Sequence, residues 1–93
     1  MEILDLAINE IEEISGMEAM ADTLDELWIN NNKISDYSSI EYLGKTMKKL
    51  NGIYLAVNPV YNRSEEFKKK LKETIPCINE VEGMPLDRPQ YFI

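Results

Sequence analysis

The sequence contains no histidine and only one cysteine, Cys77. Histidine is the side chain that most often serves as a general base or a metal ligand near neutral pH, so its absence removes the simplest catalytic and metal-binding designs. A single cysteine excludes an internal disulfide framework, and we expect Cys77 to be a small buried apolar side chain. The four glycines are scattered and form no phosphate-binding loop. The sequence therefore predicts a protein that is not an enzyme and that carries no cofactor and no metal.

Long apolar runs are also lacking. No stretch approaches the ~18 consecutive apolar residues that a membrane span needs, and the first residues lack the charged start and apolar run of a signal peptide. We therefore expect an intracellular chain, in the cytoplasm, the nucleus or both, without membrane contact.

Basic residues are outnumbered by acidic ones. Ten Lys and Arg against seventeen Asp and Glu give 93 residues a net charge of −7. This charge argues against nucleic acid as a direct partner, because nucleic acid is itself a polyanion. One basic stretch, Lys68–Lys70 with Arg63 and Lys72, falls on a predicted helix, where a solvated face is a more ordinary explanation than a phosphate site.

Three segments of the chain share the pattern L-x-x-L-x-L-x-x-N-x-L, with Met or other aliphatic residues at the Leu positions. They read MEILDLAINEI from residue 1, LDELWINNNKI from residue 24 and LNGIYLAVNPV from residue 50. The pattern and its period are typical of leucine-rich repeats, in which each unit adds one strand and one turn to a curved stack. The sequence predicts one α/β domain over residues 1–93, a leucine-rich-repeat solenoid with a short parallel sheet on its concave side. Its repeats span 1–23, 24–49 and 50–77.

Each repeat is predicted to turn its aliphatic residues into a shared core: Leu4, Leu6 and Ile11, then Leu27, Ile29 and Ile34, then Ile53, Leu55 and Val60. The sharp turn after each strand leaves backbone donors and acceptors inside the stack. An Asn side chain offers both a donor and an acceptor, so one Asn per repeat can satisfy these groups. We therefore expect Asn9, Asn32 and Asn58 to form a structural ladder, whereas Asn30 and Asn31 lie outside the obligatory pattern.

The segments that return the chain between strands differ from repeat to repeat. Apolar residues spaced by three over 14–20 suit a 3₁₀ or short helical return, and residues 37–47 show the spacing of an amphipathic helix. A second helix is predicted between Ser64, a suitable N-cap, and Pro76, which stops it. Together with the irregular strand "INEVEG" that follows, this helix forms a predicted C-terminal cap over about residues 59–93.

Residues that alternate with the core positions are expected on the open concave face of the sheet. Asp5, Trp28 and Tyr54 hold the same place in successive repeats, so they should form a row with one inter-strand spacing (~4.8 Å) between neighbours. An exposed Trp beside a Tyr and carboxylates is what a protein-binding hot spot requires. The alternative is that the two rings only shield the sheet by packing on each other.

The stretches LDLAINEIEEI, LDELWINNNKISDYSSIE and IYLAVNPVYN resemble the C-terminal repeats and cap of the leucine-rich-repeat regulatory subunit of protein phosphatase 1. That regulator belongs to a wider group that includes axonemal dynein light chain 1 and the U2 small nuclear ribonucleoprotein A-prime protein. The E-L-W repeat followed at once by the Y-L-x-x-N-P repeat favours the regulator within this group. The ending EGMPLDRPQYFI is closer to the dynein light chain, and the regulator has many more repeats.

The resemblance implies both a function and a site. By motif match, the phosphatase-contacting positions of the regulator fall on Asp5, Glu26, Trp28 and Tyr54, a set suited to basic side chains with aliphatic stems. It implies a non-catalytic module that binds the catalytic subunit of protein phosphatase 1 through its concave face. The alternative is a structural adaptor of the same group, such as a dynein light chain or a splicing scaffold component. A third alternative is a truncated paralogue that folds but binds nothing specific.

The first predicted strand has no neighbour on its N-terminal side. Its apolar residues Leu4, Leu6 and Ile11 would lie uncovered there, and exposed sheet edges and apolar patches invite pairing. We therefore expect self-association through this edge, docking onto another polypeptide, or further repeats in a longer product.

Overall fold

The computed structural model describes residues 2–86, so Met1 and residues 87–93 of the predicted cap lie outside the part discussed below. Over these residues the chain alternates strands with return segments. The elements are β1 (Glu2–Asp5), a 3₁₀ turn (Glu18–Met20), β2 (Leu24–Trp28), α1 (Ser38–Thr46), β3 (Gly52–Tyr54), α2 (Glu65–Thr74), β4 (Glu80–Val81) and β5 (Met84–Pro85).

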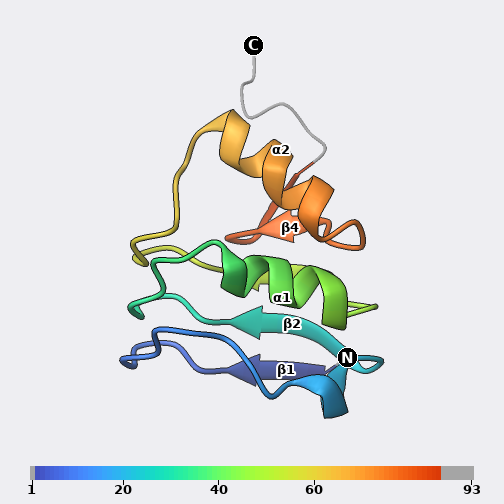
Figure 1. Ribbon diagram of the computed structural model, residues 1–93. Coiled ribbons are helices and arrows are strands. Elements are labelled where there is room, and N and C mark those ends of the chain that lie inside the picture. Colours follow the sequence, from blue (N-terminus) through green and yellow to red (C-terminus); the bar gives the residue numbers. More distant parts are fainter. Residues whose placement is uncertain (1, 87–93) are drawn as a thin grey trace.

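The strands form one sheet in the order of the sequence. Strands β1 to β4 pair in parallel, and β5 turns back to pair antiparallel with β4. Figure 1 displays them stacked from blue β1 to red β4, with α1 and α2 on one side of the sheet. Parallel neighbours need a crossover, and each repeat supplies one through its turn and return segment. The architecture is thus α/β with a largely parallel sheet, as the sequence predicts.

The core lies between the sheet and the return segments. In the second and third repeats, five predicted inward positions are buried: Leu27, Ile29, Ile34, Ile53 and Leu55. The first repeat differs, because Leu4, Leu6 and Ile11 are only half-buried. These residues have a covering repeat on one side only within the described part of the chain, so their outer side stays accessible. Val60, also predicted to be inward, is half-buried as well.

Helices α1 and α2 are held against each other at close range. A Cβ atom on Gly44 would lie 2.1 Å from the backbone oxygen of Thr74, so only glycine permits this approach. The hydroxyl of Tyr37 lies 2.8 Å from Oγ1 of Thr74, and the Tyr37 ring meets Phe67 edge to face. Burial raises the pKa of Tyr37 above its ordinary value. Ser64 caps α2 as predicted, since its Oγ accepts the N–H of Phe67 at 3.1 Å.

Asn32 joins the turn of its own repeat to the turn of the preceding repeat. Its buried side chain donates from Nδ2 to the carbonyl of Ile29 in its own turn, and to that of Leu6 one repeat earlier, both at 3.0 Å. Its Oδ1 accepts the N–H of Ile11, also at 3.0 Å. Its Nδ2 also donates to the carbonyl of Asn30 at 3.2 Å, so one amide contacts four backbone groups in two repeats.

Asn58 repeats the arrangement one unit further along the stack. Its Nδ2 donates to the carbonyls of Leu55 and Ile29 at 2.8 and 2.9 Å, and its Oδ1 accepts the N–H of Ile34 at 3.1 Å. Asn9 is exposed, and its amide donates only to carbonyls of its own turn, at 3.0 and 3.2 Å. Among the three pattern asparagines, Asn32 and Asn58 therefore have the side chains that bond across repeats.

The residue before each pattern asparagine adopts a left-handed backbone conformation. The φ angles are +58° at Ile8, +58° at Asn31 and +60° at Val57. Asn tolerates this conformation, whereas β-branched Ile and Val are strained in it. Sequence analysis gave Asn31 no role in the pattern, and the structure corrects this: Asn31 supplies the left-handed turn residue and Asn32 the bridging amide.

We expect Asn58→Ala to lower the free energy of unfolding by about 2–4 kcal/mol, because it strands two carbonyls and one N–H in the buried turn. Urea denaturation followed by circular dichroism measures the loss. Asn9→Ala is the matched control, and its exposed amide should contribute less than about 1 kcal/mol. Equal losses in the two variants would contradict the bridging role of Asn58.

Relief of the backbone strain at Val57 should stabilise the fold. We expect Val57→Asn to raise the free energy of unfolding by about 1 kcal/mol, and the reciprocal change Asn31→Val to lower it by at least as much. Thermal melting of both variants beside the wild-type chain tests this. A Val57→Asn variant that melts no higher than wild type would show that the left-handed turn carries no such penalty.

Candidate functional site

The face of the sheet that points away from the helices carries the residues that sequence analysis singled out. Strand register pairs Asp5 with Trp28 and Trp28 with Tyr54, so the three stand on adjacent strands. Glu26 lies two positions before Trp28 on β2, on the same face. We call Asp5, Glu26, Trp28 and Tyr54 the acidic–aromatic face.

The two aromatic rings of this face form one unit. Trp28 and Tyr54 pack edge to face with ring centroids 5.6 Å apart and an interplanar angle of 61°. The indole Nε1–H of Trp28 donates to Oε1 of Glu26. Both rings are half-buried, so Trp28 is less open than the sequence suggested. The rings do shield the sheet, as in the alternative weighed above, and the same contacts fix the indole in one orientation.

Gly52 lies buried between two carboxylate side chains. Register pairs it with Glu26 on β2 and with Glu80 on β4. A Cβ atom at this position would lie 3.5 Å from Cγ of Glu26 and 3.9 Å from Cβ of Glu80. Both are ordinary van der Waals distances, so a small side chain at this position would touch both acidic residues without displacing them. Asp5 is exposed, and its Oδ1 accepts the N–H of Ala7 at 3.0 Å, which shapes the first turn.

Glu82 has a different place from the one predicted. Strand alternation in the segment INEVEG predicts Glu82 beside Glu80 on the open face, but β4 ends at Val81 and Glu82 turns away with a φ of +53°. Its Oε2 accepts the N–H groups of Leu55 and Ala56, the latter at 3.0 Å. Glu82 thus supplies the acceptor that a following repeat would provide. The sequence signal for this turn is the glycine that comes directly after it.

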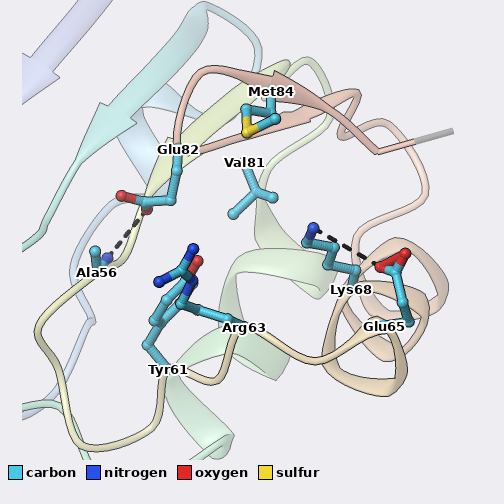
Figure 2. A pocket seen from close by; sticks show the side chains of 8 residues that line it. All are labelled: Ala56, Tyr61, Arg63, Glu65, Lys68, Val81, Glu82 and Met84. Carbon is cyan, nitrogen blue, oxygen red and sulfur yellow. Dashed lines mark hydrogen bonds and ion pairs between the residues drawn. The ribbon is translucent and has the colours of Figure 1, made fainter. Parts of the chain in front are cut away.

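A pocket lies between this carboxylate, the turn of the third repeat and the start of α2. Its volume is about 660 Å³. Figure 2 shows the side chains that line it, which are Ala56, Tyr61, Arg63, Glu65, Lys68, Val81, Glu82 and Met84. Burial raises the pKa of Tyr61 above its ordinary value; the charge of Glu82 adds to this effect and Arg63 opposes it.

The basic stretch of α2 does not form the single solvated face that the sequence suggested. The side chain of Lys68 is only 18% exposed and lies 3.7 Å from the carboxylate of Glu65. The ammonium group of Lys70 lies 4.1 Å from the centre of the Tyr37 ring. Lys69 is exposed. The structure thus divides these cations among a pocket, a cation–π contact and solvent.

The described part of the chain holds few other features that would point to a reactive thiol, a metal site or a membrane span. Cys77 is half-buried against the core. Over residues 2–86, no three His, Cys, Asp or Glu side chains gather in a way that could hold a metal ion. No helix in this range is long and apolar enough to cross a membrane.

Loss of the Glu82 carboxylate should loosen the end of the sheet. We expect Glu82→Ala to lower the free energy of unfolding by about 2 kcal/mol, because hydrogen bonds to a charged acceptor contribute about 1.5–3 kcal/mol. Hydrogen exchange should accelerate at the amides of Leu55 and Ala56. Glu80→Ala is the control, since the Glu80 carboxylate accepts no hydrogen bond from residues 2–86. Unchanged exchange at both amides in Glu82→Ala would contradict this role.

Comparison with known proteins adds a relative and a structural neighbour. No protein-family model matches the sequence. A chain of the solved structure of Chaetomium Mex67:Mtr2 subunits matches with a TM-score of 0.77, over 96% of this chain and 62% of that chain. The two sequences are 22% identical, so this likeness concerns the fold alone.

The sequence is also similar to dynein axonemal light chain 1 of Chlamydomonas reinhardtii. The two are 31% identical over 115 residues, which cover 94% of this chain and 58% of the relative. The chain therefore spans well under two thirds of the length of this relative. This likeness supports the leucine-rich-repeat group predicted from the sequence and gives no support to the phosphatase regulator within it.

Proposed function

We propose that the chain is a non-catalytic protein-binding module, part of a leucine-rich-repeat solenoid that acts as an adaptor in a larger assembly. The observation that carries this proposal is the contact of Trp28 with Tyr54 and Glu26 on the sheet. Aromatic side chains that are fixed before binding lose little conformational entropy when a partner covers them. Such rings dominate binding energy at protein interfaces.

The chemistry of the face defines the partner surface it would suit. Asp5, Glu26 and Glu80 place three carboxylates around the two rings, on a chain of net charge −7. A basic surface would be attracted to this charge and oriented by it. Lys or Arg side chains of the partner could lay their aliphatic stems on Trp28 and Tyr54 and direct their charged ends to the carboxylates.

The first candidate assembly is a motor complex. This is supported by the likeness to dynein axonemal light chain 1, whose name describes a subunit of axonemal dynein. On this proposal the chain binds a larger dynein subunit through the acidic–aromatic face. The chain matches 58% of that relative, so the proposal concerns a binding surface and not the whole activity of the relative.

The second candidate partner is the catalytic subunit of protein phosphatase 1. One observation favours it: Asp5, Glu26, Trp28 and Tyr54 match the contact positions of the phosphatase regulator in residue type, and all four lie on one face over adjacent strands. The comparisons do not support this partner, so it ranks behind the dynein assembly. A splicing scaffold remains an alternative within the same group.

Both candidates can be tested with one set of variants. We expect Trp28→Ala to weaken binding to the true partner at least ~30-fold, since loss of a central aromatic anchor costs about 2–4 kcal/mol. Calorimetry with purified axonemal dynein and with purified phosphatase catalytic subunit measures this. Glu26→Gln should weaken the same complex, whereas Glu41→Gln, an exposed carboxylate change on α1, should not.

The outcomes separate the two partners. Binding of dynein alone, sensitive to Trp28→Ala, would favour the motor assembly, and the reverse would favour the phosphatase. If a folded wild-type chain bound neither protein, both named partners would be wrong. If Trp28→Ala bound as tightly as wild type, the acidic–aromatic face would not be the binding site.

A further inference from the structure

Backbone N–H groups near the end of each strand donate to the next repeat in the first two repeats, but only in part in the third. In the first repeat, the N–H of Asn9 donates to the carbonyl of Asn31 in the next repeat at 3.2 Å. In each of the first two repeats, two further N–H groups at equivalent positions donate to carbonyls of the next repeat at 2.7–3.0 Å. These donors are Leu6 and Ile8 in the first repeat, and Ile29 and Asn31 in the second. The equivalent donors of the third repeat are Leu55 and Val57, because the pattern asparagines align Asn58 with Asn9 and Asn32.

The cap fills only one of these two positions. Glu82 accepts the N–H of Leu55 with its carboxylate, and the adjacent N–H of Ala56 as well. No acceptor within residues 2–86 meets the N–H of Val57. Its equivalents Ile8 and Asn31 donate at 3.0 and 2.9 Å to a neighbouring repeat, so the third repeat offers a donor where its neighbours are paired.

A charged group beside this turn also lacks a partner. Arg63 makes no hydrogen bond and no ion pair with residues 2–86, and Figure 2 places its guanidinium beside Tyr61 and facing Glu82. The other charges of the pocket are already engaged: Glu82 by two backbone N–H groups, and Lys68 by Glu65 at 3.7 Å. Among the described residues that line the pocket, Arg63 is therefore the cation that remains available to a ligand.

Three apolar side chains also line the pocket, and its size suits a short peptide. Ala56, Val81 and Met84 form an apolar wall, and Met84 is 48% exposed. A volume of about 660 Å³ accommodates two amino-acid residues of a peptide, within the range of small-molecule sites. Arg63 lines the same pocket as this wall, and Val57 directly follows the wall residue Ala56 in the sequence.

We propose that this pocket, the cap pocket, binds a peptide segment of the partner in which a Glu side chain is followed by an apolar residue. The Glu carboxylate pairs with the guanidinium of Arg63, a backbone carbonyl accepts the N–H of Val57, and the apolar side chain covers Val81 and Met84. The proposal rests on the protein-binding function proposed above and adds a second contact, separate from the acidic–aromatic face.

The lining favours a carboxylate over a phosphate group. A planar guanidinium matches a carboxylate with two parallel hydrogen bonds. Glu65 and Glu82 also line the pocket, and they repel a group of charge near −2 more than a single carboxylate. An apolar side chain of the peptide, next to its carboxylate, would also cover the apolar wall, which inorganic phosphate would leave exposed to water.

Two capped dipeptides test the pocket directly. N-acetyl-Glu-Leu-amide and its neutral counterpart N-acetyl-Gln-Leu-amide are titrated into the isotope-labelled chain and followed by NMR. Salt of about 0.15 M limits the reach of the overall negative charge to ~8 Å. We expect the Glu peptide to shift the signals of the Val57 amide and the Arg63 side chain with a Kd in the millimolar range or below. The Gln peptide should bind about tenfold more weakly.

Two variants identify the contact. Arg63→Gln should weaken the Glu peptide about tenfold and leave the weak binding of the Gln peptide unchanged. Lys69→Gln removes the same charge from an exposed position of α2 outside the pocket lining, so it should bind the Glu peptide as wild type does. Equal affinity for the two peptides, or an unaffected Arg63→Gln variant, would overturn the cap pocket as a carboxylate site.

The same titration separates this proposal from the proposed function. Trp28→Ala lacks the aromatic anchor of the sheet face but keeps the cap pocket. If this variant loses the whole partner and still binds the Glu peptide, both sites stand. If no peptide binds while partner binding depends on Trp28, only the cap pocket is wrong. If the peptide binds and the partner ignores Trp28→Ala, only the sheet face is wrong.

Discussion

The side-chain amides of Asn32 and Asn58 connect neighbouring repeats in the turns that follow the strands, beyond the reach of strand pairing. Each turn directs backbone groups into the interior, and one amide satisfies at least three of them across two repeats. Once the turns are stacked in this way, the strands before them can pair in only one register. That register places Trp28 beside Tyr54. The arrangement of the open face therefore depends on the buried amides of Asn32 and Asn58 in the turns that follow.

The same need for backbone partners explains how the stack ends. The described chain provides a carboxylate, Glu82, in place of the carbonyl that another repeat would supply, and β5 folds back on β4 to cover the edge. A single carboxylate is smaller than a whole repeat. It accepts the N–H of Leu55 but does not reach that of Val57, and a pocket lies beside it. The pocket is thus a direct result of ending a repeating structure with a short element.

Spacing alone predicts most of this fold, and the reasons for its failures are physical. Alternation placed Leu27 and Ile53 inward and Trp28 and Tyr54 outward, because a strand has a fixed period of two. Helix signals around Ser64 placed α2 within a residue at each end. Left-handed turns at Ile8 and Val57 could not be predicted, since neither residue type favours them. Glutamate does not favour the left-handed conformation of Glu82 either, and Gly83 directly after it is the one local signal for this turn.

The contacts between repeats have a consequence for how such a chain changes over time. Repeats meet through backbone hydrogen bonds, a bridging Asn and a shared apolar core. An additional unit with the same pattern between Asn32 and Asn58 would therefore find equivalent partners on both sides. The insertion would move Tyr54 away from Trp28 by one strand, about 4.8 Å, and end their contact. The fold would persist, while the surface that faces a partner would change. In such a protein, the number of repeats is a heritable variable that alters recognition at little cost to folding.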